Sequence, residues 1–266
     1  MLSVCATPIG NLDDVTLRVL AELRAADIVL CEDTRHTRGL LARHGIETRL
    51  LSYHQHNEAA RTAELVPRLE AGERIALVSD AGLPGVNDPG ARLISAALER
   101  GVAVSVLPGP SAVETALVAS GLVGERYQFL GYLPRRASEL AALWRELESW
   151  PHPAVAFESA QRLPASLASL AEAFPARSVA VCRELTKRFE EVVRGDATDV
   201  AERVRDGVRG EITVVIGGAA TAAADPVEAE AAVAELLAAG VPRRQAAELV
   251  SRLTGVARNR LYNASL

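Results

Sequence analysis

RIALVSDAGLPGVNDPGARLISAALERGVAVSVLPGPSAVETALVASG, residues 74–121, is the stretch that decides the predicted fold. The apolar run IALV (75–78) predicts a strand covered on both faces. Asp88-Pro89 predicts the start of a helix, with aspartate as the N-cap and proline at the first helical position. Gly101 ends that helix, residues 102–107 predict the next strand, and residues 108–111 turn into another helix. This order is typical of a parallel sheet flanked by helices.

Two loops rich in glycine and proline, residues 79–85 and 108–111, follow the carboxyl ends of these successive strands. In an open α/β sheet, ligands bind at that edge. Backbone N–H groups at helix N-termini favour a carboxylate or phosphate there. Two interpretations remain open at this point: a ligand-binding edge, or a pair of tight strand-to-helix turns.

The residues before this stretch repeat the same alternation. Apolar runs at 2–6, 28–31 and 50–53 predict strands, and a helix is expected to start at Asp13-Asp14. Asp33 or Thr34 can cap the helix after the second strand. We therefore expect an N-terminal α/β domain over residues 1–122.

A second α/β domain is expected over residues 123–218. Runs at 129–133, 155–157 and 178–182 predict strands, and runs at 191–195 and 212–216 predict an antiparallel pair. Residues 219–266 then form a predicted helical module. Its first part carries Asp225, Glu228, Glu230 and Glu235 and no basic residue, whereas residues 241–266 carry five arginines against Glu248. This pattern is typical of a helix-turn-helix, or of a helical hairpin with a solvated arginine face.

The composition indicates a globular protein of 266 residues with a real core, since 49% of its residues are hydrophobic. The net charge of −5 means that any nucleic-acid contact needs a local basic patch, because dedicated nucleic-acid-binding domains are usually basic. The three cysteines lie in apolar runs, as expected of reduced thiols. The sequence has no signal-peptide pattern and no apolar run of about 18 residues, so we expect a soluble cytoplasmic protein without membrane contact.

Several chemistries lack their motifs. No GxGxxG follows the first strand, no Walker A loop is present, and Ser111 is not in a nucleophile elbow. His54 and His56 have no further histidine or cysteine at metal-ligand spacing, so no metal is expected.

Seven short motifs occur together and in order: TPIGNL (7–12), EDTRHT (32–37), SDAGLPGVNDPG (79–90), PGPSA (108–112), FES (157–159), RELTK (183–187) and GE (210–211). As a set they resemble the tetrapyrrole-methylase superfamily, in its branch of small-subunit ribosomal RNA cytidine ribose 2′-O-methyltransferases. The resemblance extends over nearly the whole chain. It implies a class III methyltransferase fold: two α/β domains with a cleft between them, plus the helical module.

The resemblance also implies S-adenosylmethionine (SAM) as methyl donor and a decoding-centre cytidine of 16S rRNA as target, in free rRNA or in the small ribosomal subunit. A homodimer is implied as well. The implied SAM-binding residues lie in the loops of both domains: Pro8, Asp80, Ala81, Gly82, Pro84, Asp88, Pro108, Gly109, Ser111, Ala112, Glu158 and Ser159. Leu83 departs from the family pattern, which prefers threonine there.

Ribose methylation needs help for a poor nucleophile, from a base or a nearby cation. The candidates are Asp33, Glu184 and Lys187, whose alternative roles are a helix cap, an ion pair and a phosphate contact. We expect the EDTRHT and RELTK motifs to face each other and hold the target nucleotide. The expected substrate-binding residues are Arg35, His36, Arg183, Arg243, Arg244 and Arg258.

Two alternative functions remain: SAM-dependent C-methylation of a tetrapyrrole, and non-catalytic RNA binding or assembly on the same fold. The EDTRHT motif and the basic C-terminus favour RNA over a tetrapyrrole. The intact loops at 79–90 and 108–112 favour an enzyme.

Overall fold

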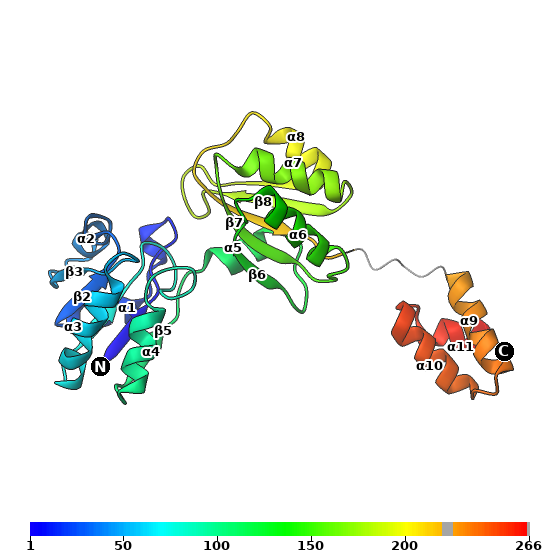
Figure 1. Cartoon of the computed structure of the whole chain (residues 1–266), viewed down its shortest axis with the longest axis horizontal. Helices are drawn as coiled ribbons and strands as arrows, with labels where there is room; N and C mark the ends of the chain where they lie inside the picture. The colour runs from blue at the N-terminus through cyan, green and yellow to red at the C-terminus, as the bar shows by residue number, and fades with distance from the viewer. Residues whose placement is uncertain (220–225, 265–266) are drawn as a thin grey trace. The chain divides into compact units, whose positions relative to one another are not determined.

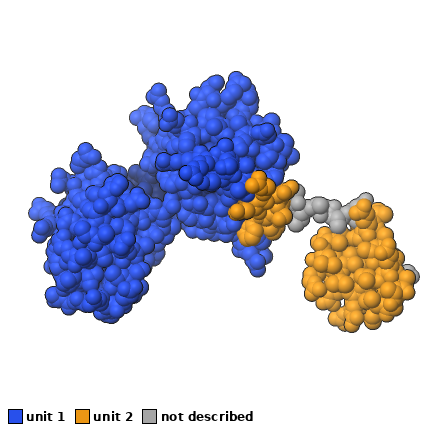
Figure 2. All heavy atoms as spheres, viewed as in Figure 1, with its two compact units in different colours: residues 1–144, 152–217 blue, residues 145–151, 218–266 orange. Residues whose placement is uncertain are grey.

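The computed structural model describes residues 1–219 and 226–264. The chain divides into two compact units, residues 1–144 with 152–217 and residues 145–151 with 218–266 (Figure 2). The first unit contains both β-sheets, and the second contains the C-terminal helices (Figure 1). The predicted boundary at residues 122–123 stays a prediction, because both sheets belong to one unit.

The first sheet is fully parallel, with the strand order β3-β2-β4-β1-β5. Its strands are β1 (Leu2–Cys5), β2 (Ile28–Cys31), β3 (Leu50–Ser52), β4 (Ile75–Leu77) and β5 (Val104–Leu107). The helices between them are α1 (Leu17–Ala25), α2 (Thr34–Arg43), α3 (Glu58–Glu70) and α4 (Ala91–Glu99). Alternate strand residues pack on α3 and α4 on one face and on α1 and α2 on the other. Burial on both faces explains why these strands are continuous apolar runs.

Two predicted helix starts were wrong. Residues 12–14 form only a 3₁₀ turn, and α1 begins after Thr16, whose side chain accepts a hydrogen bond from the Val19 N–H. Helix α4 begins after Gly90 rather than at Asp88-Pro89. Gly90 has φ 139°, and a Cβ there would lie 2.9 Å from Leu77 Cδ2. The loop therefore continues past Pro89, and Asp88 bonds to Ser79 inside it.

The second sheet has the order β6-β7-β10-β8-β9. Its strands are β6 (Gln128–Tyr132), β7 (Ala154–Ser159), β8 (Ser178–Arg183), β9 (Glu191–Asp196) and β10 (Glu211–Ile216). The predicted pairing of the last two strands was wrong, because both pair with β8, on its opposite edges and antiparallel. Helices α6 (Ala137–Leu147), α7 (Leu163–Ala173) and α8 (Ala197–Arg203) complete this half.

Helix α5 (Ala112–Ser120) follows β5 in the chain but packs on the second sheet. Val113 and Leu117 share a buried cluster with Val155, Cys182 and Val215 of that sheet. Ile9, from the loop after β1, belongs to the same cluster. The core of the second sheet thus fixes one loop of the first sheet.

The C-terminal unit contains α9 (Pro226–Ala238), α10 (Arg243–Thr254) and α11 (Arg258–Ala264), which pack on one another. Its core is small and mostly built of alanine and valine, with Leu261 fully buried. Asp225, counted above with the acidic residues, lies outside the described residues. In the part of the chain described here, no helix is both long and apolar enough to span a membrane.

Candidate functional site

Four loops meet at the carboxyl edge of the first sheet. The Thr7 N–H donates to the Gly82 carbonyl at 2.8 Å, and the Gly82 N–H donates back at 3.1 Å. The Asp33 N–H donates to Asp80 Oδ1 at 3.2 Å. Backbone and side-chain bonds therefore join the loops after β1, β2 and β4 into one surface.

The loop after β5 reaches the same surface. A Cβ on Gly82, which has φ 80°, would lie 3.8 Å from the Pro110 carbonyl oxygen. A Cβ on Gly109 would lie 2.9 Å from the Cβ of Ala6. Gly109 is therefore needed for the close approach to Ala6, and Gly82 for its positive φ. Pro108 is exposed, and Ser111 stands at the N-cap of α5 with its hydroxyl bonded to Glu114.

The RELTK motif closes on this edge from the second sheet. The Asn11 N–H donates to Thr186 Oγ1 at 2.9 Å. A Cβ on Gly10 would lie 2.5 Å from Lys187 Cγ and 2.7 Å from Thr186 Oγ1, so the approach requires glycine. Glu184 and Thr186 have φ values of 50° and 64°, which non-glycine residues rarely adopt. Backbone strain of this kind gathers at ligand sites, where the surrounding structure holds it in place. We call residues 184–187 the clasp.

Lys187 is held between two carboxylates. Its Nζ lies 3.0 Å from Glu184 Oε1 and 3.0 Å from Glu211 Oε2, and the Glu211 N–H donates to Glu184 at 2.9 Å. Lys187 and Glu211 line a cavity of about 100 Å³ at the joined loops. The residues that complete its wall are Thr7, Pro8, Ile9, Gly10, Leu12, His36, Thr37, Leu40, Ser79, Asp80 and Ala81. Residues of the TPIGNL, EDTRHT, SDAG and RELTK motifs therefore share one cavity.

The three candidate catalytic residues differ in what they can do. Hydrogen bonds from the Arg35 guanidinium and N–H hold the pKa of Asp33 well below its usual range, and Asp33 also caps α2. The Glu211 N–H and then Lys187 lower the pKa of Glu184. Burial lowers the pKa of Lys187, but its bonds to Glu184 and Glu211 outweigh burial and raise it. The geometry suits Lys187 as a fixed cation better than either carboxylate as a proton acceptor.

Three carboxyl groups gather under the joined loops, and this feature was missed in the sequence. Burial, and then the charges of Asp88 and Asp80, raise the pKa of Glu32 to about 7. Burial, and then the charge of Asp80, raise the pKa of Asp88 to about 6, although a hydrogen bond from Ser79 lowers it in part. We call Glu32, Asp80 and Asp88 the acidic group. Because like charges placed close together disfavour ionisation, the acidic group is suited to receive a cation. The signal in the sequence was Glu32 after β2 and Asp80 after β4, two strands that are neighbours in the sheet.

Residues expected from the second domain have mixed placements. Glu158 is buried and ion-paired with Arg162, and its carboxylate also accepts from Ser166 at 2.6 Å, so it supports the turn after β7. Ser159 is exposed. Arg183 pairs with Glu191 at 3.0 Å. Leu83 packs on the first-sheet core, which gives its side chain a packing role instead of a polar contact.

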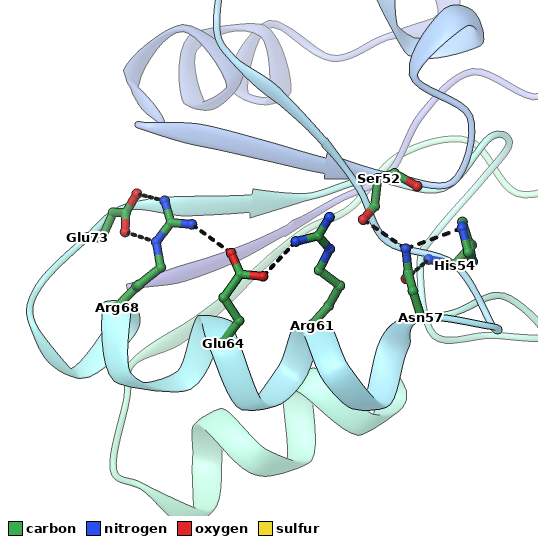
Figure 3. Close-up of polar contacts among 7 residues, drawn as sticks. All are labelled: Ser52, His54, Asn57, Arg61, Glu64, Arg68 and Glu73. Carbon is green, nitrogen blue, oxygen red and sulfur yellow. Dashed lines mark hydrogen bonds and ion pairs between the residues drawn. The ribbon is translucent and has the colours of Figure 1, made fainter.

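His54 belongs to a locally closed turn (Figure 3), and the rings of His54 and His56 pack edge to face with centroids 5.9 Å apart. Asn57 accepts from the His54 N–H at 2.8 Å, bonds to its ring at 3.2 Å and donates to the Ser52 carbonyl. Beyond it, Arg61, Glu64 and Arg68 of α3 form an ion-pair ladder that ends at Glu73, after the helix. Across residues 1–219 and 226–264, no cluster of three or more histidine, cysteine or acidic residues could hold a metal.

The basic residues of the C-terminal unit lie on α10 and α11. Arg244 and Arg258 are exposed and Arg243 is partly exposed. Arg260 pairs with Glu230 of α9 at 3.0 Å.

Comparison with known proteins agrees with the motifs. A family model for tetrapyrrole (corrin/porphyrin) methylases matches residues 1–201, and one for the RsmI C-terminal HTH domain matches residues 223–266. The chain is 42% identical to the ribosomal RNA small subunit methyltransferase I of Mesorhizobium japonicum, over 100% of this chain and 91% of that protein. It is 43% identical to the protein of that name from Micromonospora olivasterospora, over 98% and 85%.

Among solved structures, the cobalamin biosynthetic enzyme cobalt precorrin-4 methyltransferase matches with a TM-score of 0.63 and 19% identity, over 81% of this chain and 94% of that one. At this identity the match shows the fold alone, and it confirms the class III methyltransferase architecture. The resemblance inferred from the seven motifs is confirmed by the family models and the relatives. The chain therefore belongs to the tetrapyrrole (corrin/porphyrin) methylase family and, within it, to the ribosomal RNA small subunit methyltransferases I.

Proposed function

We propose that this protein transfers a methyl group from SAM to the ribose 2′-hydroxyl of a decoding-centre cytidine in 16S rRNA. The observation that carries the proposal is the cavity lined both by the joined loops, with Pro8, Asp80 and Ala81, and by His36 and Lys187. Membership of the family supports the reaction class.

The joined loops fit SAM chemically. The acidic group would offer negative charge to a ligand that carries a sulfonium and an ammonium group. Burial, and then the neighbouring carboxyl charges, raise the pKa values of Glu32 and Asp88, and a bound cation would favour their ionised forms. The loop at 108–112 leads into the N-terminus of α5, which suits a carboxylate. When bound, SAM would supply an electrophilic methyl group: its carbon–sulfur bond would break as the new carbon–oxygen bond forms, a neutral thioether would leave, and the 2′-hydroxyl proton would pass to solvent water.

The protein's own part is positioning more than acid–base catalysis. Lys187 is a cation fixed by Glu184 and Glu211 beside the cavity, where it would stabilise the developing charge on the 2′-oxygen. His36 and Arg35 would hold flanking phosphates or the base. A cytidine within an rRNA helix has to be turned out of the stack to reach such a cavity.

The exposed arginines of α10 and α11 would dock the RNA through its phosphates, with Arg243, Arg244 and Arg258 as the expected contacts. The proposed partner is 16S rRNA, free or within the small subunit, in the cytoplasm. We further propose a homodimer. Light scattering of the purified protein tests it.

The test combines methyl transfer with product identification. Purified protein is incubated with methyl-labelled SAM and small ribosomal subunits that lack their ribose methyl groups, and the RNA is digested to nucleosides. Labelled 2′-O-methylcytidine is the expected product. Label in a base would contradict ribose methylation. RNA binding without any transfer would favour the non-catalytic alternative, and transfer only to a tetrapyrrole would favour the other.

A further inference from the structure

Tyr132 is a large aromatic side chain left exposed at the carboxyl end of β6. Tyr132 is 61% exposed as a residue, whereas Phe129 and Phe157 behind it are partly buried. Tyr132 and Phe157 have ring centroids 5.6 Å apart in an edge-to-face arrangement, and Phe157 and Phe129 are 5.0 Å apart in the same way. The three rings form one cluster, and Tyr132 is its solvent-facing end.

A β-bulge places Tyr132 in this cluster. Phe129 pairs with Val155 and Tyr132 pairs with Phe157, so three steps along β6 match two along β7. In a regular strand, residues three apart point to opposite faces of the sheet. The extra residue brings Tyr132 to the face that Phe129 and Phe157 share, and Gly131, with φ 67°, supplies the turn. Bulges that re-aim a side chain are frequent next to active sites.

The backbone around Tyr132 is fixed from both sides. The Leu133 N–H donates to the Phe157 carbonyl at 3.0 Å, and Arg162 donates to the Leu133 carbonyl at 3.0 Å. A Cβ on Gly131 would lie 3.1 Å from Asn87 Oδ1, so the 79–90 loop packs against the bulge. The exposed ring therefore stands beside the loop that carries Asp80 and Asp88.

We propose that Tyr132 is a stacking platform for an unpaired base of the RNA substrate, a proposal that rests on the proposed function. Aromatic side chains on sheets stack single-stranded bases with little sequence preference. A rigid ring costs little conformational entropy on binding. Exposed Arg135 and Arg136 follow it, and Arg136 is only partly neutralised by a surface pair with Glu139. Two arginines suit the phosphates of an RNA strand and have no use beside the adenine of SAM, and Tyr132 does not line the cavity with Pro8 and Asp80.

The test uses Tyr132→Ala, with Tyr132→Phe as the variant that keeps the ring. Leu98→Ala removes a similarly exposed apolar side chain from α4 and is the matched control. Three quantities are measured on full-length protein: SAM affinity by calorimetry, affinity for a single-stranded oligocytidylate of about ten nucleotides, and KM and kcat for small subunits. The thermal unfolding midpoint checks the fold.

Tyr132→Ala should weaken oligocytidylate binding, and raise KM for small subunits, by roughly five- to 100-fold, the range of one aromatic–base stack. SAM affinity should stay unchanged, and Tyr132→Phe and Leu98→Ala should behave as the wild type. Unchanged RNA affinity in Tyr132→Ala overturns the proposal. Lost SAM affinity with normal RNA affinity also overturns it and assigns the ring to adenine. If the wild type methylates no ribosomal RNA, the proposed function fails, while the oligocytidylate arm still decides the stacking role.

Discussion

Replacing Glu32 by glutamine should stabilise this protein at pH 8 and leave its stability nearly unchanged at pH 5. Glu32 follows β2, is partly buried, and faces the charges of Asp88 and Asp80. Glutamine has the same shape and can still accept the Asp80 N–H that reaches this side chain, but it carries no charge. The substitution therefore removes the cost of burying a charge, and the smaller repulsion from Asp88 and Asp80, without leaving a cavity.

The magnitude follows from the pKa shift. In the folded protein the pKa of Glu32 is about 7 against an ordinary 4.5, and one pKa unit is worth about 1.4 kcal/mol. Because the folded-state pKa is the higher one, the associated stability is present below pH 4.5 and is lost as the pH rises towards 7. The wild type thus loses up to roughly 3 kcal/mol across this window, and about 2–3 kcal/mol is expected after partial solvent screening.

The assay compares thermal unfolding midpoints of Glu32→Gln and wild type at pH 5 and pH 8. A gain of about 5–10 °C at pH 8 is expected, since 1 kcal/mol shifts the midpoint by roughly 2–4 °C at this chain length. The difference should shrink to a degree or two at pH 5. Glu99→Gln, at an exposed position on α4, should change neither midpoint. Equal midpoints at pH 8, or a less stable glutamine variant, would refute the proposed repulsion. SAM affinity should fall in Glu32→Gln, because one negative charge is lost.

Three other substitutions test the clasp and the RNA surface. Gly10→Ala should reduce kcat at least tenfold, because the added Cβ would lie only 2.5 Å from Lys187 Cγ and would displace Lys187 and Thr186. Methyl-transfer rates at saturating RNA measure this, and a wild-type kcat would contradict the close approach. Lys187→Met should lower kcat by roughly 100-fold while SAM affinity stays near normal. Calorimetry measures the affinity and single-turnover experiments measure the rate. An unchanged rate would mean that Lys187 has only a structural role. Arg244→Glu should weaken RNA binding uniformly across sequences and reduce the slope of log affinity against log salt concentration by about 1 or more. Binding titrations at several salt concentrations measure this slope, and an unchanged slope would mean that α10 has only a structural role.

The parallel sheet was predictable because its strands are buried on both faces. Runs such as residues 28–31 and 75–78 have to be continuous and apolar, so periodicity locates them to within a residue. The loops were predictable from their glycine and proline residues. Asp33 as the cap of α2 was also confirmed, since its side chain accepts the Arg35 N–H.

Local signals failed where a distant contact decided the conformation. Asp88-Pro89 has the pattern of a helix start, but the contact of Gly90 with Leu77 and the burial of Asp88 moved that start to Ala91. The segments at 191–195 and 212–216 have strand patterns that carry no information about their partner. In the structure β8 lies between them. The sequence could not show this, because a strand of alternating pattern can pair with any free edge.

The site depends on contacts that sequence spacing cannot reveal. Asn11 and Thr186 are 175 positions apart, and only the fold brings them within 2.9 Å. The same contact bears on the chain's one lysine: of 29 basic side chains, the other 28 are arginines. A general bias toward arginine explains the 28 but leaves the exception open. The Cγ of Lys187 lies against Gly10, and its ammonium lies 3.0 Å from both Glu184 and Glu211 beside the cavity. An ammonium is a compact point charge, whereas a guanidinium is planar and larger. The one lysine of the chain thus lies in the wall of the cavity, and this favours a working role for Lys187 over an ion pair of structural value alone.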